Sequence, residues 1–68
     1  MNDQEKAEFR DALVRLFGET WDTSQLQASY SVEGFVGGLV VVTRKSDGKR
    51  GSLGFTHMPR FYHSFQEA

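Results

Sequence analysis

The chain has 68 residues, of which 38% are apolar and 25% are charged, and it contains one proline and no cysteine. A chain of this length forms one small domain, residues 1–68, without room for a second core. The lack of cysteine excludes a disulfide framework and a thiolate nucleophile, so we expect a reducing, cytoplasmic location. The longest apolar run, residues 35–42, is far shorter than the roughly 20 residues that span a bilayer, and we expect no membrane partner.

The formal net charge of −1 hides an uneven distribution of charged residues. Residues 1–33 carry seven acidic and three basic side chains, whereas residues 34–68 carry two acidic and five basic ones. Two arrangements fit this distribution. Either the basic half meets nucleic acid or an acidic protein, or the acidic half of the chain folds onto it.

The first expected element is a helix over residues 3–17. Asn2 is a good N-cap, Glu5 completes a capping-box pattern, and Gly18 supplies a C-terminal stop. Apolar residues recur at helical spacing and form one stripe, made of Phe9, Ala12, Leu13, Leu16 and Phe17. The opposite face is charged, and we interpret it as solvated surface.

Three strands are expected next, over residues 25–31, 35–45 and 49–56. Apolar and polar residues alternate in the first, valines dominate the second, and Asp47-Gly48 predicts a hairpin between the second and third. The aromatic tail, residues 57–68, fits either a short helix that begins at Pro59 or a fourth strand. The predicted fold is therefore α+β, with an N-terminal helix packed on a three-stranded antiparallel sheet in the order α-β-β-β.

The register of the strands decides which side chains share a face. A three-residue loop, Val32-Glu33-Gly34, with Gly34 in the left-handed conformation would place the apolar residues of every strand on one inner face. That face would comprise Leu26, Ala28, Tyr30, Val36, Val40, Val42, Leu53 and Phe55, covered by the helix stripe. The outer face would then keep three apolar residues among small polar ones, namely Phe35, Leu39 and Val41. Either the tail covers these three residues or a partner does.

Enzyme chemistry has little support in the sequence. His57 and His63 are the only histidines, and no nucleophile with a base or pair of carboxylates stands out. We therefore expect no enzymatic activity, no metal and no cofactor.

The predicted function is protein binding, either to a larger protein or to a second copy as a homodimer. Phe35, Leu39 and Val41 would dock into the partner. Four basic residues around the second hairpin would steer the protein toward an acidic surface, namely Arg44, Lys45, Lys49 and Arg50. A phage or mobile-element accessory protein that modulates a larger host protein would suit a chain of this size.

The alternative is a nucleic-acid-binding accessory protein that uses the basic hairpin. Its candidate contacts are Arg44, Lys45, Lys49, Arg50, Arg60 and Tyr62. The expected element order, with a helical tail, resembles that of the double-stranded RNA-binding domain. The resemblance stops at the second helix, because Arg60 is the only basic residue after Pro59 and that family begins its long second helix with lysines.

Overall fold

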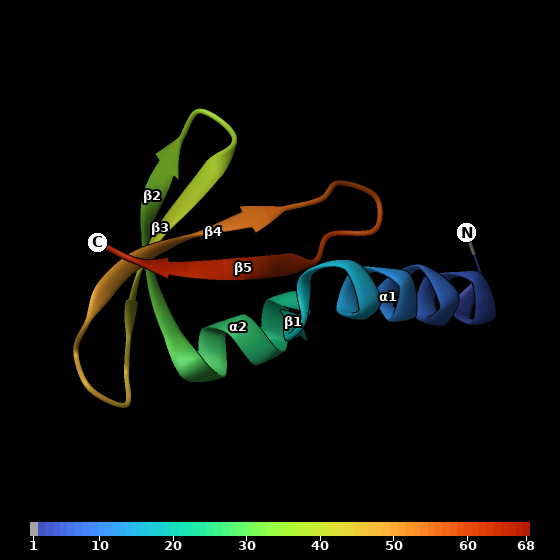
Figure 1. Ribbon diagram of the computed structural model, residues 1–68, viewed down its shortest axis with the longest axis horizontal. Helices are drawn as coiled ribbons and strands as arrows, with labels where there is room; N and C mark the ends of the chain where they lie inside the picture. Colours follow the sequence, from blue (N-terminus) through green and yellow to red (C-terminus); the bar gives the residue numbers. More distant parts are fainter. Residues whose placement is uncertain (1) are drawn as a thin grey trace.

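The computed structural model describes residues 2–68 as an α+β fold with two helices and one five-stranded antiparallel sheet. The strand order is β1-β5-β4-β3-β2. The short helix α2 lies against one face of the sheet, and α1 extends away from the body beside β1 and β5 (Figure 1). We call the sheet face toward α2 the inner face and the opposite one the outer face.

The first helix, α1, spans Asp3–Phe17 as the sequence predicts. The Asn2 side chain accepts a hydrogen bond from the backbone N–H of Glu5 at 2.8 Å, and Gly18 ends the helix with a φ of 85°. The prediction that α1 covers the sheet is wrong. It contacts only β1 and β5 closely, Leu13 is its single buried residue, and Leu16 is 74% exposed. Neither described helix is long and apolar enough to cross a membrane.

The strand expected over residues 25–31 is a helix for most of its length. After the two-residue strand β1, Thr20–Trp21, the helix α2 spans Thr23–Ser29. The Asp22 side chain accepts from the N–H of Gln25 at 2.7 Å, and the Gln25 side chain accepts from the N–H of Asp22 at 3.1 Å. This capping box fixes a helical first turn, and local capping outweighs a period-two pattern that rests on very few apolar residues.

The first hairpin turns four residues later than predicted. Strand β2 spans Tyr30–Val36, strand β3 spans Leu39–Arg44, and Gly37-Gly38 forms the turn between them. Gly37 has a φ of 59°, which suits the first central position of a two-residue hairpin turn. The predicted loop at residues 32–34 is instead a β-bulge inside β2. The extra residue moves every later side chain of β2 to the other face.

The second hairpin joins β3 to strand β4, Arg50–Phe55. Val40 pairs with Leu53 and Val42 with Gly51, whereas a two-residue loop at Asp47-Gly48 would pair Val42 with Leu53, a difference of two residues. The loop is longer than Asp47-Gly48 alone, since the N–H of Arg44 bonds the carbonyl of Lys49. A shift of two residues keeps each side chain on its face, so the predicted grouping of Val40, Val42 and Leu53 is confirmed.

The tail is a strand, which decides between the two alternatives left open by the sequence. Strand β5, Tyr62–Glu67, pairs with β4 on one side and with β1 on the other. It therefore extends the sheet and does not lie across the outer face of β2, β3 and β4. Because β4 is followed by β5 and not by a helix, the element order expected of a double-stranded RNA-binding domain is absent from residues 2–68.

The core lies between α2 and the inner face. Its buried members are Leu26, Tyr30, Val40, Val42, Leu53 and Tyr62, with Trp21, Phe55 and Phe65 packed at its margin. Two predicted members are wrong: Ala28 is exposed on α2, and the bulge places Val36 on the outer face. A second contact joins α1 to the sheet, where Phe9 packs beside the buried Phe61 with ring centroids 6.1 Å apart.

Candidate protein-binding face

The outer face carries two rows of side chains that run across the strands. Residues opposite one another in an antiparallel sheet project from the same face. The first row is Val36, Leu39, Gly54 and His63, one residue from each of β2, β3, β4 and β5. The second row is Gly34, Val41, Ser52 and Gln66.

The apolar members of this face are open to solvent. Val36 is 67% exposed and Leu39 is 48% exposed, and Val41 beside them is half-buried. At the other end of the first row, the ring of Phe17 stacks on the imidazole of His63 with centroids 4.1 Å apart and planes 11° apart. We call these five residues, Val36, Leu39, Val41, His63 and Phe17, the outer patch.

A glycine in the middle of the outer patch leaves no side chain between Leu39 and His63. Gly54 stands between Leu39 and His63 in the first row. A Cβ added to Gly54 would lie 2.8 Å from Cε1 of His63, so the imidazole leans over the glycine. Burial lowers the pKa of His63 from its usual 6.5, because the partly buried ring loses water that would solvate its charged form. Burial therefore favours the neutral imidazole, which adds to the apolar character of the patch.

Polar side chains of β2, β3 and β4 border the outer patch on the side away from the β2–β3 turn. Glu33, the residue in the bulge, accepts a hydrogen bond from the Thr43 hydroxyl and forms an ion pair with Arg50 at 3.1 Å. Both partners belong to the outer face, since Thr43 and Arg50 are paired across β3 and β4. The outer patch thus has a polar, hydrogen-bonding border on this side, and a polar border beside apolar residues is found in many protein interfaces.

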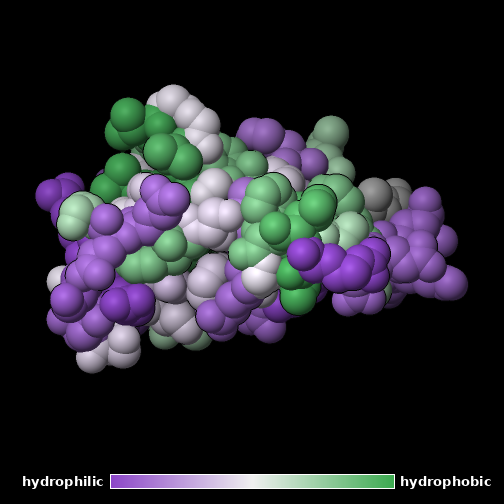
Figure 2. All heavy atoms as spheres, viewed as in Figure 1, coloured by the Kyte–Doolittle hydropathy of each residue, from purple (hydrophilic) through white to green (hydrophobic). Residues whose placement is uncertain are grey.

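The surface view shows the same distribution. Green atoms gather near the tip of the β2–β3 hairpin and again near the C-terminal end of α1, with paler residues between them (Figure 2). The exposed large apolar residues of the β2–β3 hairpin are Val32, Phe35, Val36 and Leu39, and those of the last turn of α1 are Val14, Leu16 and Phe17. Exposed apolar areas of this kind mark interaction sites more often than chance.

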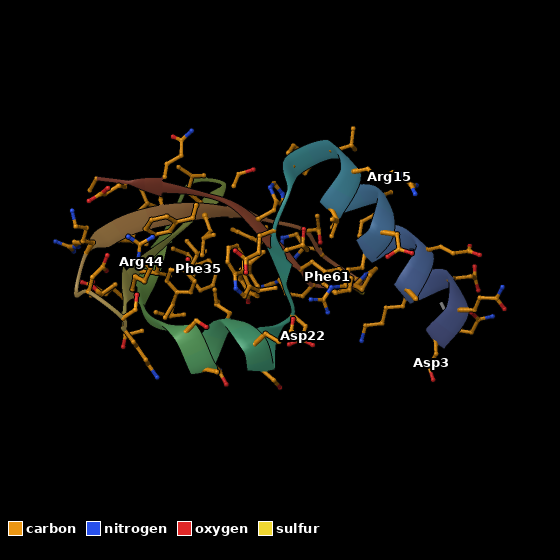
Figure 3. All side chains as sticks on the ribbon, turned by 60° about the horizontal axis from the view of Figure 1, so that its bottom comes forward. Asp3, Arg15, Asp22, Phe35, Arg44 and Phe61 are labelled. Carbon is orange, nitrogen blue, oxygen red and sulfur yellow. The ribbon has the colours of Figure 1, made fainter. Side chains whose placement is uncertain are left out.

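Of the three residues predicted to dock, Leu39 and Val41 lie on the outer face and Phe35 does not. Phe35 is paired with Val40 on the inner face, where its ring meets Phe55 edge-on with centroids 5.3 Å apart. Figure 3 shows Phe35 and Arg44 on the side of the sheet where α2 lies. The cause is the bulge at Glu33, which reverses the side of the sheet that Phe35 faces.

The four cations of the second hairpin are all engaged within the chain. Arg44 forms an ion pair with Asp47 at 2.7 Å, and Lys49 pairs with Glu67 at 2.9 Å. The Lys45 ammonium donates to the carbonyl of Gln27 at 2.8 Å, and Arg50 is held by Glu33. Counting Asp47, Glu67 and Glu33, this region keeps one net positive charge.

These contacts also shift the pKa values of charged side chains in the β3–β4 hairpin. The hydrogen bonds from Arg44 and from the N–H of Lys49 lower the pKa of Asp47 to about 2. The hydrogen bond to Glu67 raises the pKa of Lys49, and the bond to Asp47 raises that of Arg44. Exposed ion pairs of this type add little stability, but they hold the cations in place.

The remaining residues of the nucleic-acid alternative lie elsewhere. Tyr62 is buried in the core, and the Arg60 guanidinium lies over the Phe55 ring at 4.9 Å and donates to Nδ1 of His57 at 3.0 Å. Arg60 belongs to the β4–β5 loop, whereas Arg44 to Arg50 surround the β3–β4 turn at the opposite end of β4. Within residues 2–68, no three acidic or histidine side chains gather in a way that could hold a metal ion.

Sequence reasoning missed Val36, His63 and Phe17 as members of the patch. The signal that could have found Val36 was Gly37-Gly38 between apolar residues, a hairpin sequence that would have corrected the register.

Comparison with known protein families, curated proteins and solved structures finds no match.

Proposed function

We propose that the protein is a small protein-binding module that docks through the outer patch on an apolar surface of a larger protein. The observation that carries the proposal is the first row, in which Val36 and Leu39 stay exposed although the sheet continues from them to His63, on which Phe17 of α1 stacks. A domain of this size gains strongly from every apolar residue that it buries, so exposed neighbours on one face favour a surface kept for a partner.

The chemistry of the patch favours an apolar partner over an acidic one. Burying a leucine or valine side chain completely contributes about 1.5–3 kcal/mol, and these residues have roughly half of that still to gain. The cations predicted to steer the protein toward acidic surfaces are paired with Asp47, Glu67 and Glu33 or bonded to a carbonyl, which weakens their long-range field. At the border of the patch, Arg50 and Glu33 can still hydrogen-bond with polar groups of the partner.

The nucleic-acid alternative has weaker support for the same reason. Phosphate binding needs cations that can release counterions, and those of the β3–β4 hairpin already have acceptors in the chain. A mobility shift at low salt that becomes weaker in a Lys49→Ala, Arg50→Ala variant would favour this alternative.

Affinity capture from cells that naturally express the protein tests the proposal. We expect Leu39→Asp to weaken capture of the partner at least about tenfold, equivalent to about 1.4 kcal/mol, because a carboxylate would be buried in the interface. Met58→Asp is the matched control, since Met58 is a 92% exposed apolar residue in the β4–β5 loop. Equal capture by both variants and the unchanged protein would contradict the proposal.

Two further measurements complete this test. Thermal unfolding shows whether Leu39→Asp keeps the fold, and Leu39→Ala takes its place in the capture experiment if it does not. The identity of the captured protein tests the narrower hypothesis that this chain is a phage or mobile-element accessory protein acting on a larger host protein.

A further inference from the structure

A second unoccupied surface lies along the edge of the sheet. Strand β2 is the last strand in the order and pairs only with β3. The β2–β3 hairpin projects from the body of the molecule, and α2 reaches only the start of β2 (Figure 1). The far half of β2, residues 33–36, therefore offers a free strand edge.

The turn fixes which backbone groups point to that edge. Val36 and Leu39 flank the two-residue turn Gly37-Gly38, and residues in this position exchange both backbone hydrogen bonds. The next pair, Phe35 and Val40, is then a non-hydrogen-bonded pair, because the two types alternate along an antiparallel ladder. The N–H and C=O of Phe35 consequently point away from β3, toward the free edge.

Apolar side chains are exposed on both sides of this edge. Phe35 on the inner face is 54% exposed, and Val36 on the outer face is more exposed still. A helix or a flat surface could cover only one of the two faces, whereas an added strand covers both and also satisfies the backbone of Phe35. The free backbone groups and the apolar side chains on both faces thus favour a β-strand as the partner of this edge.

The charge distribution along the β2 edge favours pairing with β2 of a second copy of the protein. Exposed edges are commonly protected by lysine, proline or inward-pointing charge. Between Tyr30 and Gly38 the only charged residue is Glu33, and its carboxylate is already held by Arg50 and Thr43. An apolar edge whose single charge is already paired matches best with another of the same kind, and β2 of a second copy is such an edge.

We propose that two copies of the protein form a two-fold symmetric dimer in which their β2 strands pair antiparallel, with Phe35 opposite Phe35. In this register the two Phe35 residues exchange backbone hydrogen bonds at the axis, and their rings meet on the inner face. Each Val36 lies opposite Gly34 of the second copy on the outer face, where the missing side chain leaves room for valine.

The bulge excludes a register centred on Gly34, one residue away. A two-fold axis perpendicular to the sheet keeps both inner faces on one side, so opposed residues must share a face. Centring on Gly34 would oppose Val32 of the inner face to Val36 of the outer face. In the Phe35 register, the two Glu33 residues are four positions apart along the strands, roughly 13 Å, so they repel each other little.

The dimer goes beyond the proposed function and uses the free edge of β2, which shares only Val36 with the outer patch. It would make a ten-stranded sheet with both outer patches on the same side, so that a partner with two binding sites could engage both copies. About five residues per chain take part, which places the contact at the small end of specific interfaces. We therefore expect a dimer that dissociates on dilution.

Sedimentation equilibrium from about 10 μM to 1 mM tests the dimer, with an expected rise in mass from 7.7 kDa toward twice that value as concentration increases. Chemical synthesis of the chain with an N-methyl group on Phe35 removes one edge donor without changing a side chain. We expect this variant to stay monomeric and to unfold at the same temperature as the unmodified chain. Phe35→Lys should also stay monomeric, because it adds like charges at the axis.

Leu39→Asp separates the two proposals, since it should lose the partner and keep the dimer. A monomer at every concentration, or a dimer that survives N-methylation of Phe35, would overturn the β2 pairing. A dimer lost in Leu39→Asp and kept in the N-methylated chain would also overturn it and would place self-association on the outer patch. Failure of partner capture alone would contradict the proposed docking function and would not contradict the dimer.

Discussion

Replacing Leu26 by alanine tests whether α2, and not α1, covers the core. Leu26 is 1% exposed and is the only buried residue of α2, so its side chain anchors that helix to Tyr30, Val40, Val42 and Leu53. Leucine-to-alanine changes at such sites cost about 2–5 kcal/mol, which combines the lost transfer free energy with the cavity left behind. We expect Leu26→Ala to fall in this range.

The effect of this loss on folding depends on the total free energy of unfolding of the domain. Natural domains are stable by about 0.05–0.15 kcal/mol per residue, which gives roughly 3–10 kcal/mol for a chain of this length. One kcal/mol shifts the Tm of a small domain by about 4–8 °C, so Leu26→Ala should lower the Tm by at least about 8 °C and could unfold the chain at room temperature.

Leu16→Ala is the matched control for Leu26→Ala. Leu16 belongs to the helix stripe that the sequence assigns to the core, yet it is largely exposed on α1. We expect its truncation to cost less than about 0.5 kcal/mol. Urea unfolding followed by circular dichroism measures both variants. Equal losses, or a larger loss for Leu16→Ala, would refute the assignment of α2 as the cover of the inner face.

Two further predictions concern local contacts. Asp22→Ala removes the cap of α2 and should cost about 0.5–2 kcal/mol in the free energy of unfolding, measured in urea, whereas a negligible loss would contradict the capping role. The pKa of His63 is lowered by folding, so the unfolded chain takes up this proton first as pH falls. Stability should decline below about pH 6.5 and level off below the folded pKa. His63→Gln should remove this pH dependence and His57→Gln should keep it, and a pH profile that is the same in both variants would contradict the burial of His63.

The sequence predicted the parts of the fold that local signals determine. The capping box and stripe of residues 3–17 gave α1, and the valine-rich segment with Asp47-Gly48 gave β3, β4 and the face that Val40, Val42 and Leu53 share. These signals depend only on neighbouring residues, and a two-residue error in register does not change a side chain's face.

The errors arose where two local patterns compete or where one residue is inserted. The alternation of Leu26, Ala28 and Tyr30 suggested a strand, but Leu26 and Tyr30 are also four apart, as on a helix, and the Asp22 cap decides between the two. The bulge at Glu33 moved Phe35 to the inner face and Val36 to the outer one. A single sequence shows a bulge only through pairing, which involves residues distant in the chain.

Photo-cross-linking from position 39 tests the central claim most directly. A benzoyl-phenylalanine at Leu39 lies on the outer face, and the same group at Met58 lies in the β4–β5 loop as a control. With the protein in cells that naturally express it, the account predicts a cross-link to one larger protein from position 39 and none from position 58. Cross-links from position 58 alone, or the same products from both positions, would contradict the assignment of the outer patch as the docking surface.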